Sequence, residues 1–225
     1  MAIATFKDLC IDAVDPFAVG DFWGPTLGLE VTRLEDGDVR LDGLTPQHAI
    51  WVNRVPEPVT VKQRVHLDVH AASTDDVLAR GATPLDTASF AWDVVRDPEG
   101  GELCVFTRRK VPDYRLYEIV VDSVDPFAVA EWWHGVLGGE LGGDKEKGWA
   151  WLDGLPGVPF ESLVFVSVPE PKTVKNRIHW DVDVADLQPL LDAGAHVLRA
   201  RDSDVYWTIM SDPEGNEFCA FTPRD

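Results

Sequence analysis

The sequence is short of cysteine, and it lacks the long apolar runs of membrane proteins. Its three cysteines, Cys10, Cys104 and Cys219, are odd in number and far apart, which argues against a disulfide framework and favours a reducing compartment. The opening segment, MAIATFKDLC, lacks the basic start and apolar run of a secretory signal peptide. No stretch of about 18 apolar residues, the length of a transmembrane helix, is present. We therefore expect a cytoplasmic protein.

Positive charge is also scarce. The chain has 20 Lys and Arg residues against 39 Asp and Glu residues, and its net charge is −19. Such a surface repels phosphate backbones and anionic lipids, so we expect neither nucleic acid nor a membrane as a partner. A neutral or cationic small molecule is the expected ligand, and we expect the chain to be a monomer or a homodimer.

Several well-known site motifs are missing. The sequence contains no Gly-rich phosphate loop, no Gly-x-Ser-x-Gly, no His-Glu-x-x-His and no Cys-x-x-Cys. The usual sequence signatures of dinucleotide-binding proteins, α/β-hydrolases, zinc metalloproteases and dithiol redox proteins are therefore absent. Any site must be sought in patterns peculiar to this chain.

The strongest pattern is an internal repeat. The second copy of each segment follows the first by 110 to 115 residues. A slowly growing offset indicates a tandem duplication with a few inserted loop residues. It predicts two domains, residues 1–110 and 111–225, joined by a hinge near residues 108–113. The repeated segments are DPFAV at 15–19 and 125–129, DGL at 42–44 and 153–155, VPEP at 55–58 and 168–171, and DPEG at 97–100 and 212–215.

Each copy reads as strands interrupted by two helices. Asp15 is an expected N-cap and Pro16 an expected first helical residue, which places the first helix at about residues 16–26. Period-two runs and turn residues mark the strands. In the first copy we expect strands near 5–14, 29–35, 39–41, 49–55, 61–70, 90–96 and 102–107, and a second helix from 73 to about 81. In the second copy we expect strands at 116–124, 174–183, 205–210 and 217–222, and helices at 126–136 and 185–193. The pattern predicts an α+β fold.

Two expected strands share a polar face almost letter for letter. VKQRVHLDVH at 61–70 returns as VKNRIHWDVD at 174–183, while the apolar face changes between the copies. Alternation places the polar side chains on one face. Three interpretations are open: a solvated strand face, a structural network in which Arg–Asp pairs orient the His, and a substrate site with His as acid–base and Arg as anchor. The shared residues are Arg64, His66 and Asp68 in the first copy and Arg177, His179 and Asp181 in the second.

The order of elements, the DPF helix opening, the Arg-x-His-x-Asp strand and the closing DPEG turn together resemble the glyoxalase/bleomycin-resistance/dioxygenase superfamily, also called the vicinal oxygen chelate superfamily. The resemblance covers almost the whole chain, once per half. It implies two tandem glyoxalase-like domains, each a pair of βαβββ units forming a curved open barrel with a cleft. It also turns the polar strand face toward that cleft.

The resemblance implies positions for a metal, if one is present. Metal-dependent members place ligands on the first, fourth, fifth and eighth strands. The corresponding residues are Asp8, His66 and Cys104 in the first copy, and Glu118, His179 and Cys219 in the second. The usual eighth-strand carboxylate is a cysteine both times, so we favour no cofactor, with a divalent metal as the alternative.

Two further observations concern the ligand. Trp92 and Trp207 precede the final turn of each copy, and an aromatic lining suits a flat apolar molecule. Cys104 and Cys219 are expected to be buried small side chains, with a thiolate nucleophile activated by His66 or His179 as the sharper alternative.

The sequence thus favours a metal-independent lyase or isomerase acting on a metabolite or natural product. His66 and His179 are the expected acid–base residues, and Arg64, Asp68, Trp92, Arg177, Asp181 and Trp207 the expected substrate-binding residues. A non-catalytic protein that sequesters a drug or metabolite is the first alternative, and a metal-dependent glyoxalase or dioxygenase the second.

Overall fold

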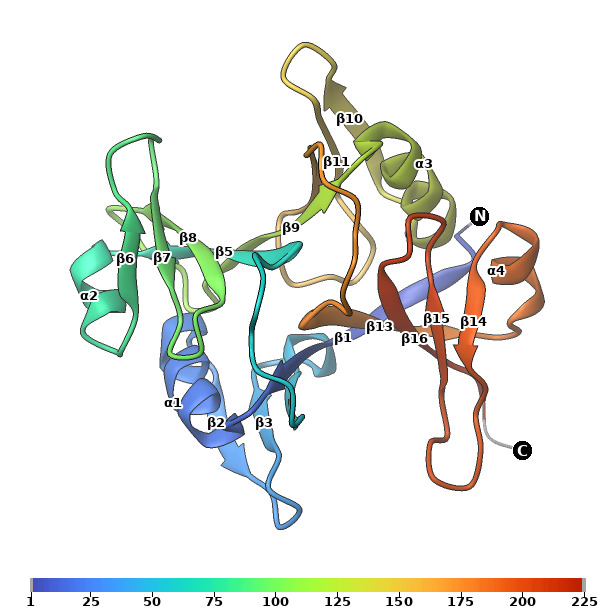
Figure 1. The fold of residues 1–225 in the computed structure, drawn as a ribbon, viewed down its shortest axis with the longest axis horizontal. Helices are drawn as coiled ribbons and strands as arrows, with labels where there is room; N and C mark the ends of the chain where they lie inside the picture. The colour runs from blue at the N-terminus through green and yellow to red at the C-terminus, as the bar shows by residue number, and fades with distance from the viewer. Residues whose placement is uncertain (1, 224–225) are drawn as a thin grey trace.

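Two open, curved eight-stranded sheets make up the protein (Figure 1). The computed structural model describes residues 2–223. The first sheet has the strand order β14 (His196–Arg199), β15 (Thr208–Ser211), β16 (Glu217–Phe221), β13 (Ile178–Val184), β1 (Ala4–Ala13), β4 (Ile50–Arg54), β3 (Val39–Asp42) and β2 (Glu30–Arg33). The second sheet has the order β10 (Glu140–Asp144), β11 (Trp149–Asp153), β12 (Ser162–Ser167), β9 (Leu116–Ser123), β5 (Val65–Ala71), β8 (Glu102–Thr107), β7 (Asp93–Arg96) and β6 (Thr83–Asp86).

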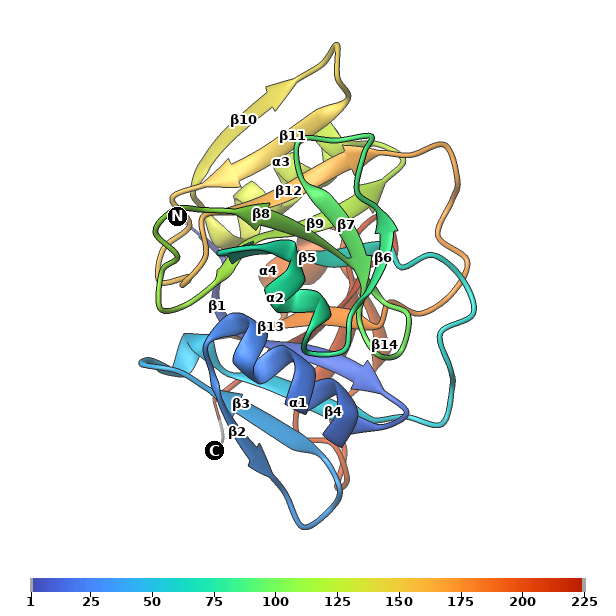
Figure 2. The same cartoon turned by 90° about the vertical axis from the view of Figure 1, so that its left-hand side faces the viewer.

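The four helices of residues 2–223 are short and lie beside the sheets. They are α1 (Pro16–Leu27), α2 (Thr74–Leu78), α3 (Pro126–Leu137) and α4 (Gln188–Asp192), with a single 3₁₀ turn at Pro46–His48. Figure 2 shows α1 lying across the first sheet, over β3 and β4. The predicted α+β class with tandem domains is confirmed, and the sheets are open rather than closed barrels. Within residues 2–223, no helix is long and apolar enough to cross a membrane.

Each sheet combines one βαβββ unit from each half of the chain. β1 pairs with β13 in the first sheet, and β5 pairs with β9 in the second, both antiparallel. The first unit therefore shares a sheet with the fourth, and the second with the third. The predicted boundary after residue 110 separates the sequence repeats but does not separate the sheets, because these central backbone ladders connect the two halves.

The first helix begins as its sequence predicts. Asp15 accepts hydrogen bonds from the backbone N–H groups of Phe17 and Ala18, at 3.1 and 3.2 Å, and Pro16 occupies the first turn. Gly28 ends the helix with φ 78°, a left-handed conformation that favours glycine. The same DPFAV segment begins α3 in the second half, where the side chain of Asp125 accepts a hydrogen bond from the N–H of Ala128 at 3.1 Å.

The repeated DPEG turn holds each half together. The Oδ1 atom of Asp97 accepts the N–H groups of Glu99 and Gly101, at 2.9 and 2.8 Å, which closes the turn between β7 and β8. Its Oδ2 atom accepts the buried indole N–H of Trp23 on α1, at 3.3 Å. Because α1 packs on the first sheet and Asp97 belongs to the second, this contact connects the first unit to the second. Trp133 and Asp212 repeat it at 3.1 Å.

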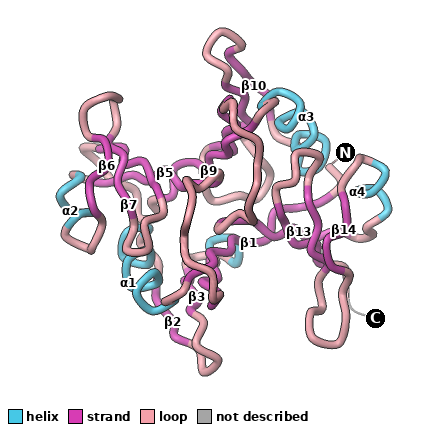
Figure 3. The backbone as a smooth tube through the Cα atoms, in the orientation of Figure 1, coloured by secondary structure: helices cyan, strands magenta, loops and turns pink. Residues whose placement is uncertain are grey.

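Two linkers cross the middle of the molecule between the sheets (Figure 3). The first is residues 55–64, between β4 and β5, and the second is residues 168–177, between β12 and β13. The strand expected over 61–70 begins only at Val65, and its copy begins at Ile178 rather than at 174. The reason is the length of the partner strands. The last backbone bond before the first linker runs from Asp122 N–H to the carbonyl of Arg64, at 2.7 Å, and β9 ends one residue later.

Candidate functional site

A β-bulge in β9 positions side chains on the polar face of the second sheet. Asp68 on β5 lies directly opposite Glu118 on β9, but Val69 pairs with Leu116, which leaves Tyr117 as the extra residue. Directly opposed residues point to the same side of a sheet, and a bulge re-aims the side chains beside it. Asp68 also pairs with Cys104 on β8. The second-sheet row, defined as His66, Asp68, Cys104 and Glu118, is therefore gathered from three adjacent strands.

The second-sheet row is tightly connected and only partly covered. His66 Nε2 lies 3.2 Å from Asp68 Oδ1 and 3.6 Å from the sulfur of Cys104. The Asp68 side chain is buried, whereas 16% of the His66 side chain is exposed. Asp68 Oδ1 has no hydrogen-bond partner of good geometry. The row thus combines a partly accessible imidazole with a buried carboxylate that lies close beside it.

The carboxyl of Glu118 is the most unusual acid of this face. Burial, followed by the negative charge of Asp68, raises the pKa of Glu118 to about 7. Burial and the same Asp68 charge raise the pKa of the Cys104 thiol. At neutral pH the thiol is therefore protonated, and Glu118 exchanges a proton readily.

The first sheet has an equivalent but more deeply buried row. The first-sheet row consists of Asp8, Cys10, His179, Asp181 and Cys219. His179 Nε2 lies 3.5 Å from the Cys219 sulfur and 3.7 Å from Asp181 Oδ1. Cys10 donates to Asp181 Oδ1 at 3.8 Å. Burial lowers the pKa of His179 to about 4, so this imidazole is neutral at physiological pH.

The two rows differ most at the carboxyl group on their first strand. Asp8 forms an ion pair with Lys7 at 2.5 Å and accepts the indole N–H of Trp51 at 3.3 Å. The repeat places Tyr117 where Lys7 stands and Val164 where Trp51 stands. Among residues 2–223, no basic side chain forms an ion pair with the equivalent Glu118. The first-sheet row is therefore neutralised internally, and the second-sheet row is not.

The pairing of units across the halves also regroups the predicted metal ligands. The sets expected were Asp8 with His66 and Cys104, and Glu118 with His179 and Cys219. In the structure the first-strand acids are exchanged, since Asp8 shares a sheet with His179 and Glu118 shares a sheet with His66. Neither predicted set comes together, because β1 and β9 each pair with the fifth strand of the other half.

Each row nevertheless contains donors that fit a metal. In the second sheet, ligand atoms of His66, Asp68 and Cys104 all lie within 4.8 Å of one another. Imidazole, carboxylate and thiolate together suit zinc, and Asp68 Oδ1 is buried without a hydrogen bond of good geometry. In the first sheet the corresponding group is Cys10, His179 and Asp181. The favoured absence of a cofactor stays a prediction.

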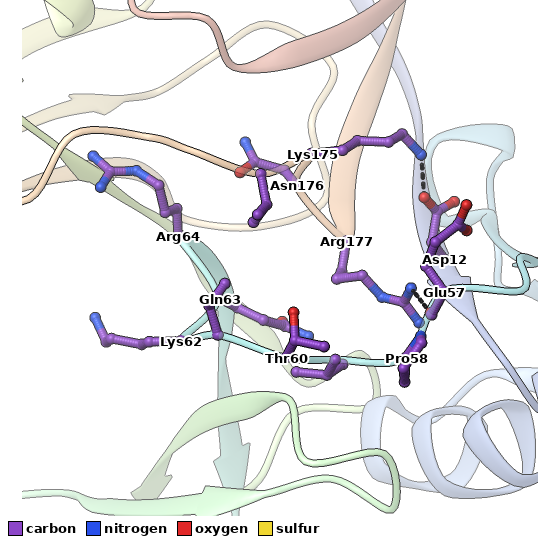
Figure 4. Close-up of a pocket in the computed structure, with 13 residues that line it drawn as sticks. Asp12, Glu57, Pro58, Thr60, Lys62, Gln63, Arg64, Lys175, Asn176 and Arg177 are labelled. Atoms are coloured by element: carbon purple, nitrogen blue, oxygen red, sulfur yellow. Dashed lines mark hydrogen bonds and ion pairs between the residues drawn. The ribbon is translucent and has the colours of Figure 1, made fainter.

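The two arginines lie apart from the rows and line a central cavity of about 570 Å³ between the linkers (Figure 4). Arg64 donates to the carbonyl of Glu170, at 2.7 Å, and Arg177 to that of Glu57, at 2.5 Å, so each guanidinium holds the opposite linker. Arg177 also forms an ion pair with Glu99 at 3.2 Å. Within residues 2–223 neither arginine forms an ion pair with Asp68 or Asp181, so these contacts connect the linkers rather than orient the histidines. An anchoring role for either arginine stays a prediction.

The predicted tryptophans belong to stacked aromatic groups. Trp92 stacks on Phe106 with ring centroids 5.2 Å apart, and Phe106 meets Tyr117 edge-on at 5.1 Å. Trp207 stacks on Phe221 at 5.5 Å in the first sheet. Sequence reasoning missed Tyr117, and it placed Glu118 only as a metal ligand. The register between β5 and β9, which the sequence does not display, brings Glu118 opposite Asp68 and Tyr117 against His70.

Comparison with known proteins agrees with this architecture. A protein-family model described as a glyoxalase-like domain matches residues 8–106 and again 118–221. No match was found among curated proteins. A variant of glyoxalase I from Zea mays is similar in structure at 12% identity, with a TM-score of 0.67 and 97% of this chain and 92% of that chain covered. A putative dioxygenase from Bacillus subtilis is similar at 14% identity, with a TM-score of 0.64 and coverage of 99% and 86%.

The CppA protein of Streptococcus pneumoniae is similar at 11% identity, with a TM-score of 0.54 and coverage of 98% and 99%. At these identities the structural similarity establishes the fold alone. The family model, in contrast, matches most of the chain in two copies. The protein therefore belongs to the glyoxalase-like domain family, within the vicinal oxygen chelate superfamily, and contains two tandem copies of that domain.

Proposed function

We propose that this protein is a lyase or isomerase that transfers protons on a small organic molecule at the second-sheet row, without a metal. The observation that carries the proposal is the environment of Glu118. It lies opposite Asp68, has no ion-pair partner in the part of the chain that the structure describes, and has a pKa of about 7. A general base works best when its pKa lies near the working pH.

In this proposal two groups share the proton transfers. Ionised Glu118 removes a proton from a carbon next to a carbonyl group of the substrate. His66, whose Nε2 lies 3.2 Å from Asp68, is oriented by that carboxylate and returns a proton at a neighbouring atom. His179 takes no part, since its side chain is 9% exposed and its pKa of about 4 keeps it neutral. The acid–base role first assigned to both histidines thus becomes a proposal for His66 alone.

One observation favours a metal-dependent alternative. The donor atoms of His66, Asp68 and Cys104 lie within 4.8 Å of one another and would hold a zinc ion. Such an ion would supply Lewis-acid polarisation of a substrate carbonyl. The metal-free version is preferred because the eighth-strand position, where metal-dependent members carry a carboxylate, is Cys104 in this sheet and Cys219 in the other.

Hydrogen–deuterium exchange tests the proposal with a range of candidate substrates at once. The purified protein is incubated in D₂O with a panel of carbonyl-containing metabolites, and loss of C–H signals is followed by NMR. We expect exchange with the unaltered protein and a loss of at least about 100-fold in Glu118→Gln, the size of a general-base contribution. Asp8→Asn is the matched control, because Asp8 is the equivalent residue of the first sheet, and it should retain exchange.

Metal analysis of the same samples separates the alternatives. Metal independence predicts no stoichiometric transition metal and unchanged exchange after treatment with a chelator. A metal that co-purifies with the unaltered protein but not with His66→Ala would favour the metal-dependent version. Ligand binding without exchange, equal in the unaltered protein and Glu118→Gln, would instead indicate a sequestering protein.

A further inference from the structure

An arginine that the proposed chemistry does not use lies at the edge of the second-sheet row. Arg108 follows directly after β8, and its side chain is exposed. Its guanidinium carbon lies 5.4 Å from the ring centre of Tyr117 and 5.6 Å from that of Phe106. Aromatic faces hold a guanidinium group in place while its N–H donors stay available.

The donors of Arg108 are largely uncommitted. The guanidinium makes one hydrogen bond, from Nη1 to the carbonyl of Thr107 at 3.3 Å. Within the described residues 2–223 it forms no ion pair, and Glu161 is instead 3.8 Å from His70. Arg108 is thus an oriented cation beside the site with no anion opposite it.

The rings under Arg108 connect it to the proposed base. Tyr117 is adjacent in the chain to Glu118, and the bulge turns both toward the polar face. His70 stacks on Tyr117, with ring centres 4.5 Å apart. Arg108 and Glu118 are therefore both neighbours of Tyr117, and a small molecule bound along this side of the row would contact both.

A flat aromatic surface extends from the same place. Trp92 stacks on Phe106 with their planes 22° apart, and Phe90 stacks on Trp92 with planes 9° apart. Phe90 is 54% exposed, which is unusual for such a large apolar side chain. Because Trp92 lies between Phe90 and Phe106, the ring that this stack offers to a planar ligand is that of Phe90.

The first sheet lacks this arrangement. At the positions equivalent to Arg108 and Tyr117 it has Pro223 and Lys7. Lys7 lies over Phe221, at 4.2 Å from the ring centre, but it is already paired with Asp8. An uncommitted cation over aromatic rings is therefore specific to the sheet in which the first-strand acid is also left without a cationic partner.

We propose that the substrate of the second-sheet row carries a carboxylate on a flat aromatic or conjugated body, with Arg108 binding the carboxylate and the exposed side of the Phe90–Trp92–Phe106 stack contacting the body. This inference rests on the proposed function, because the bound molecule is a substrate only if the second-sheet row is catalytic. The net charge of −19 favours neutral or cationic ligands in general. Arg108 is the local exception, because a paired guanidinium and carboxylate form charge-assisted hydrogen bonds.

Matched pairs of small probes test the inference. Benzoate is compared with benzamide, cinnamate with cinnamamide, and indole-3-acetate with its amide, by ligand-observed NMR and titration. At least one carboxylate should bind the unaltered protein about tenfold more tightly than its amide, as charge-assisted hydrogen bonds imply. Arg108→Gln should remove this preference without weakening the amide. Arg109→Gln, a change of the next residue, should preserve it.

A second variant tests the aromatic stack. Phe90→Ala, which removes its exposed ring, should weaken both members of a pair equally, because contact with an aromatic ring does not depend on the charge of the ligand. Circular dichroism and thermal unfolding confirm that each variant is folded. The inference is overturned if no pair shows a carboxylate preference, or if Arg108→Gln weakens acid and amide alike.

The outcome can be separated from that of the proposed function. If carboxylate binding depends on Arg108 but Glu118→Gln leaves exchange unaltered, the role of Glu118 as the base is contradicted and the carboxylate site is supported. If exchange depends on Glu118 but occurs only with neutral or cationic molecules, and Arg108→Gln leaves KM unaffected, the carboxylate inference is contradicted and the proposed proton transfer is supported.

Discussion

Asp68 lies directly opposite Glu118 across the antiparallel strands β5 and β9, so two carboxyl groups share one face of the second sheet. The equivalent residues of the first sheet, Asp8 and Asp181, are also directly opposed. The difference is the residue at the bulge, which is Lys7 beside Asp8 and Tyr117 beside Glu118. One side chain therefore decides whether each pair of acids is compensated.

Transfer of the first-sheet ion pair into the second sheet should disable the site. Tyr117→Lys places an ammonium group beside Glu118, as Lys7 lies beside Asp8, and an adjacent cation lowers a carboxyl pKa by roughly 1–3 units. The pKa of Glu118, about 7 in the native protein, should fall accordingly. Carbon-13 NMR of labelled glutamate would measure the shift, and exchange activity should fall with it. Tyr117→Phe should change the pKa in the opposite direction, because it removes the hydrogen bond from Tyr117 that lowers the pKa of Glu118.

The activity should depend on pH in a defined direction. Glu118 acts as a base only when ionised, and its pKa is about 7. The rate should therefore rise as the pH increases through about 7. A rate that rises with a midpoint near 4.5, the ordinary glutamate value, would show that Glu118 is not the base.

Acid should destabilise the protein through His179. Burial lowers the pKa of His179 to about 4 in the folded chain, whereas an unfolded histidine titrates near 6.5. The unfolded state therefore binds more protons between these values, so this stabilisation is present above the unfolded pKa and is lost as the pH falls. Lowering the pH from 7 to 5 should cost about 2 kcal/mol from this residue.

Urea unfolding at the two pH values measures this contribution. Raised carboxyl pKa values, such as that of Asp212, act in the opposite direction, because protonated acids stabilise the folded state at low pH. The comparison between the native protein and His179→Gln isolates the histidine. An equal loss of stability in both proteins would contradict the assignment.

The contact between α1 and the DPEG turn should be measurable as a coupling energy. Trp23→Phe removes the indole donor to Asp97, which should cost about 1 kcal/mol, and Asp97→Ala also leaves the N–H groups of the turn unsatisfied, which should cost about 2–3 kcal/mol. A double-mutant cycle should give about 1 kcal/mol of coupling between the two residues. The repeated pair, Trp133 and Asp212, provides a matched cycle, and no coupling in either would show that these bonds are only incidental.

The cysteines should be slow to react in the folded protein. Burial raises the pKa of the Cys104 thiol, and the charge of Asp68 raises it further, so little thiolate is present. Ellman's reagent at pH 8 should modify the native protein at least about tenfold more slowly than the unfolded chain. Asp68→Asn should accelerate the modification of Cys104, because it removes a negative charge that raises the pKa of the thiol. Fast modification of Cys104 in the native protein would instead restore the hypothesis of a thiolate nucleophile.

Local features of the fold were predictable because they depend on neighbouring residues. Asp15 and Pro16 mark the start of α1 through a side-chain cap and a preset dihedral angle, and Gly28 marks its end. Alternation placed His66 and Asp68 on one face of β5, and the structure confirms their proximity at 3.2 Å. The extent of that strand was not predictable, because it depends on where the partner strand β9 ends.

The candidate site was predictable only in part. Cys104 and His66 occupy neighbouring strands of one unit, so their approach follows from a single copy of the repeat. Glu118 comes from the other half of the chain. The resemblance groups it with His179, whereas the structure places it in the sheet of His66. Arg64 was expected beside His66, but it holds the opposite linker through Glu170, because β5 begins only after it.

The sequence by itself determined the duplication, the α+β elements, the helix caps and the polar face of each fifth strand, because these are set by contacts a few residues apart. Only the tertiary structure decided that β1 pairs with β13 and β9 with β5. Four similar units present similar backbone edges, and their repeated patterns do not distinguish one partner from another. That choice brings Glu118 to Asp68 and Lys7 to Asp8, and it leaves one sheet with an uncompensated acid and the other with an ion pair.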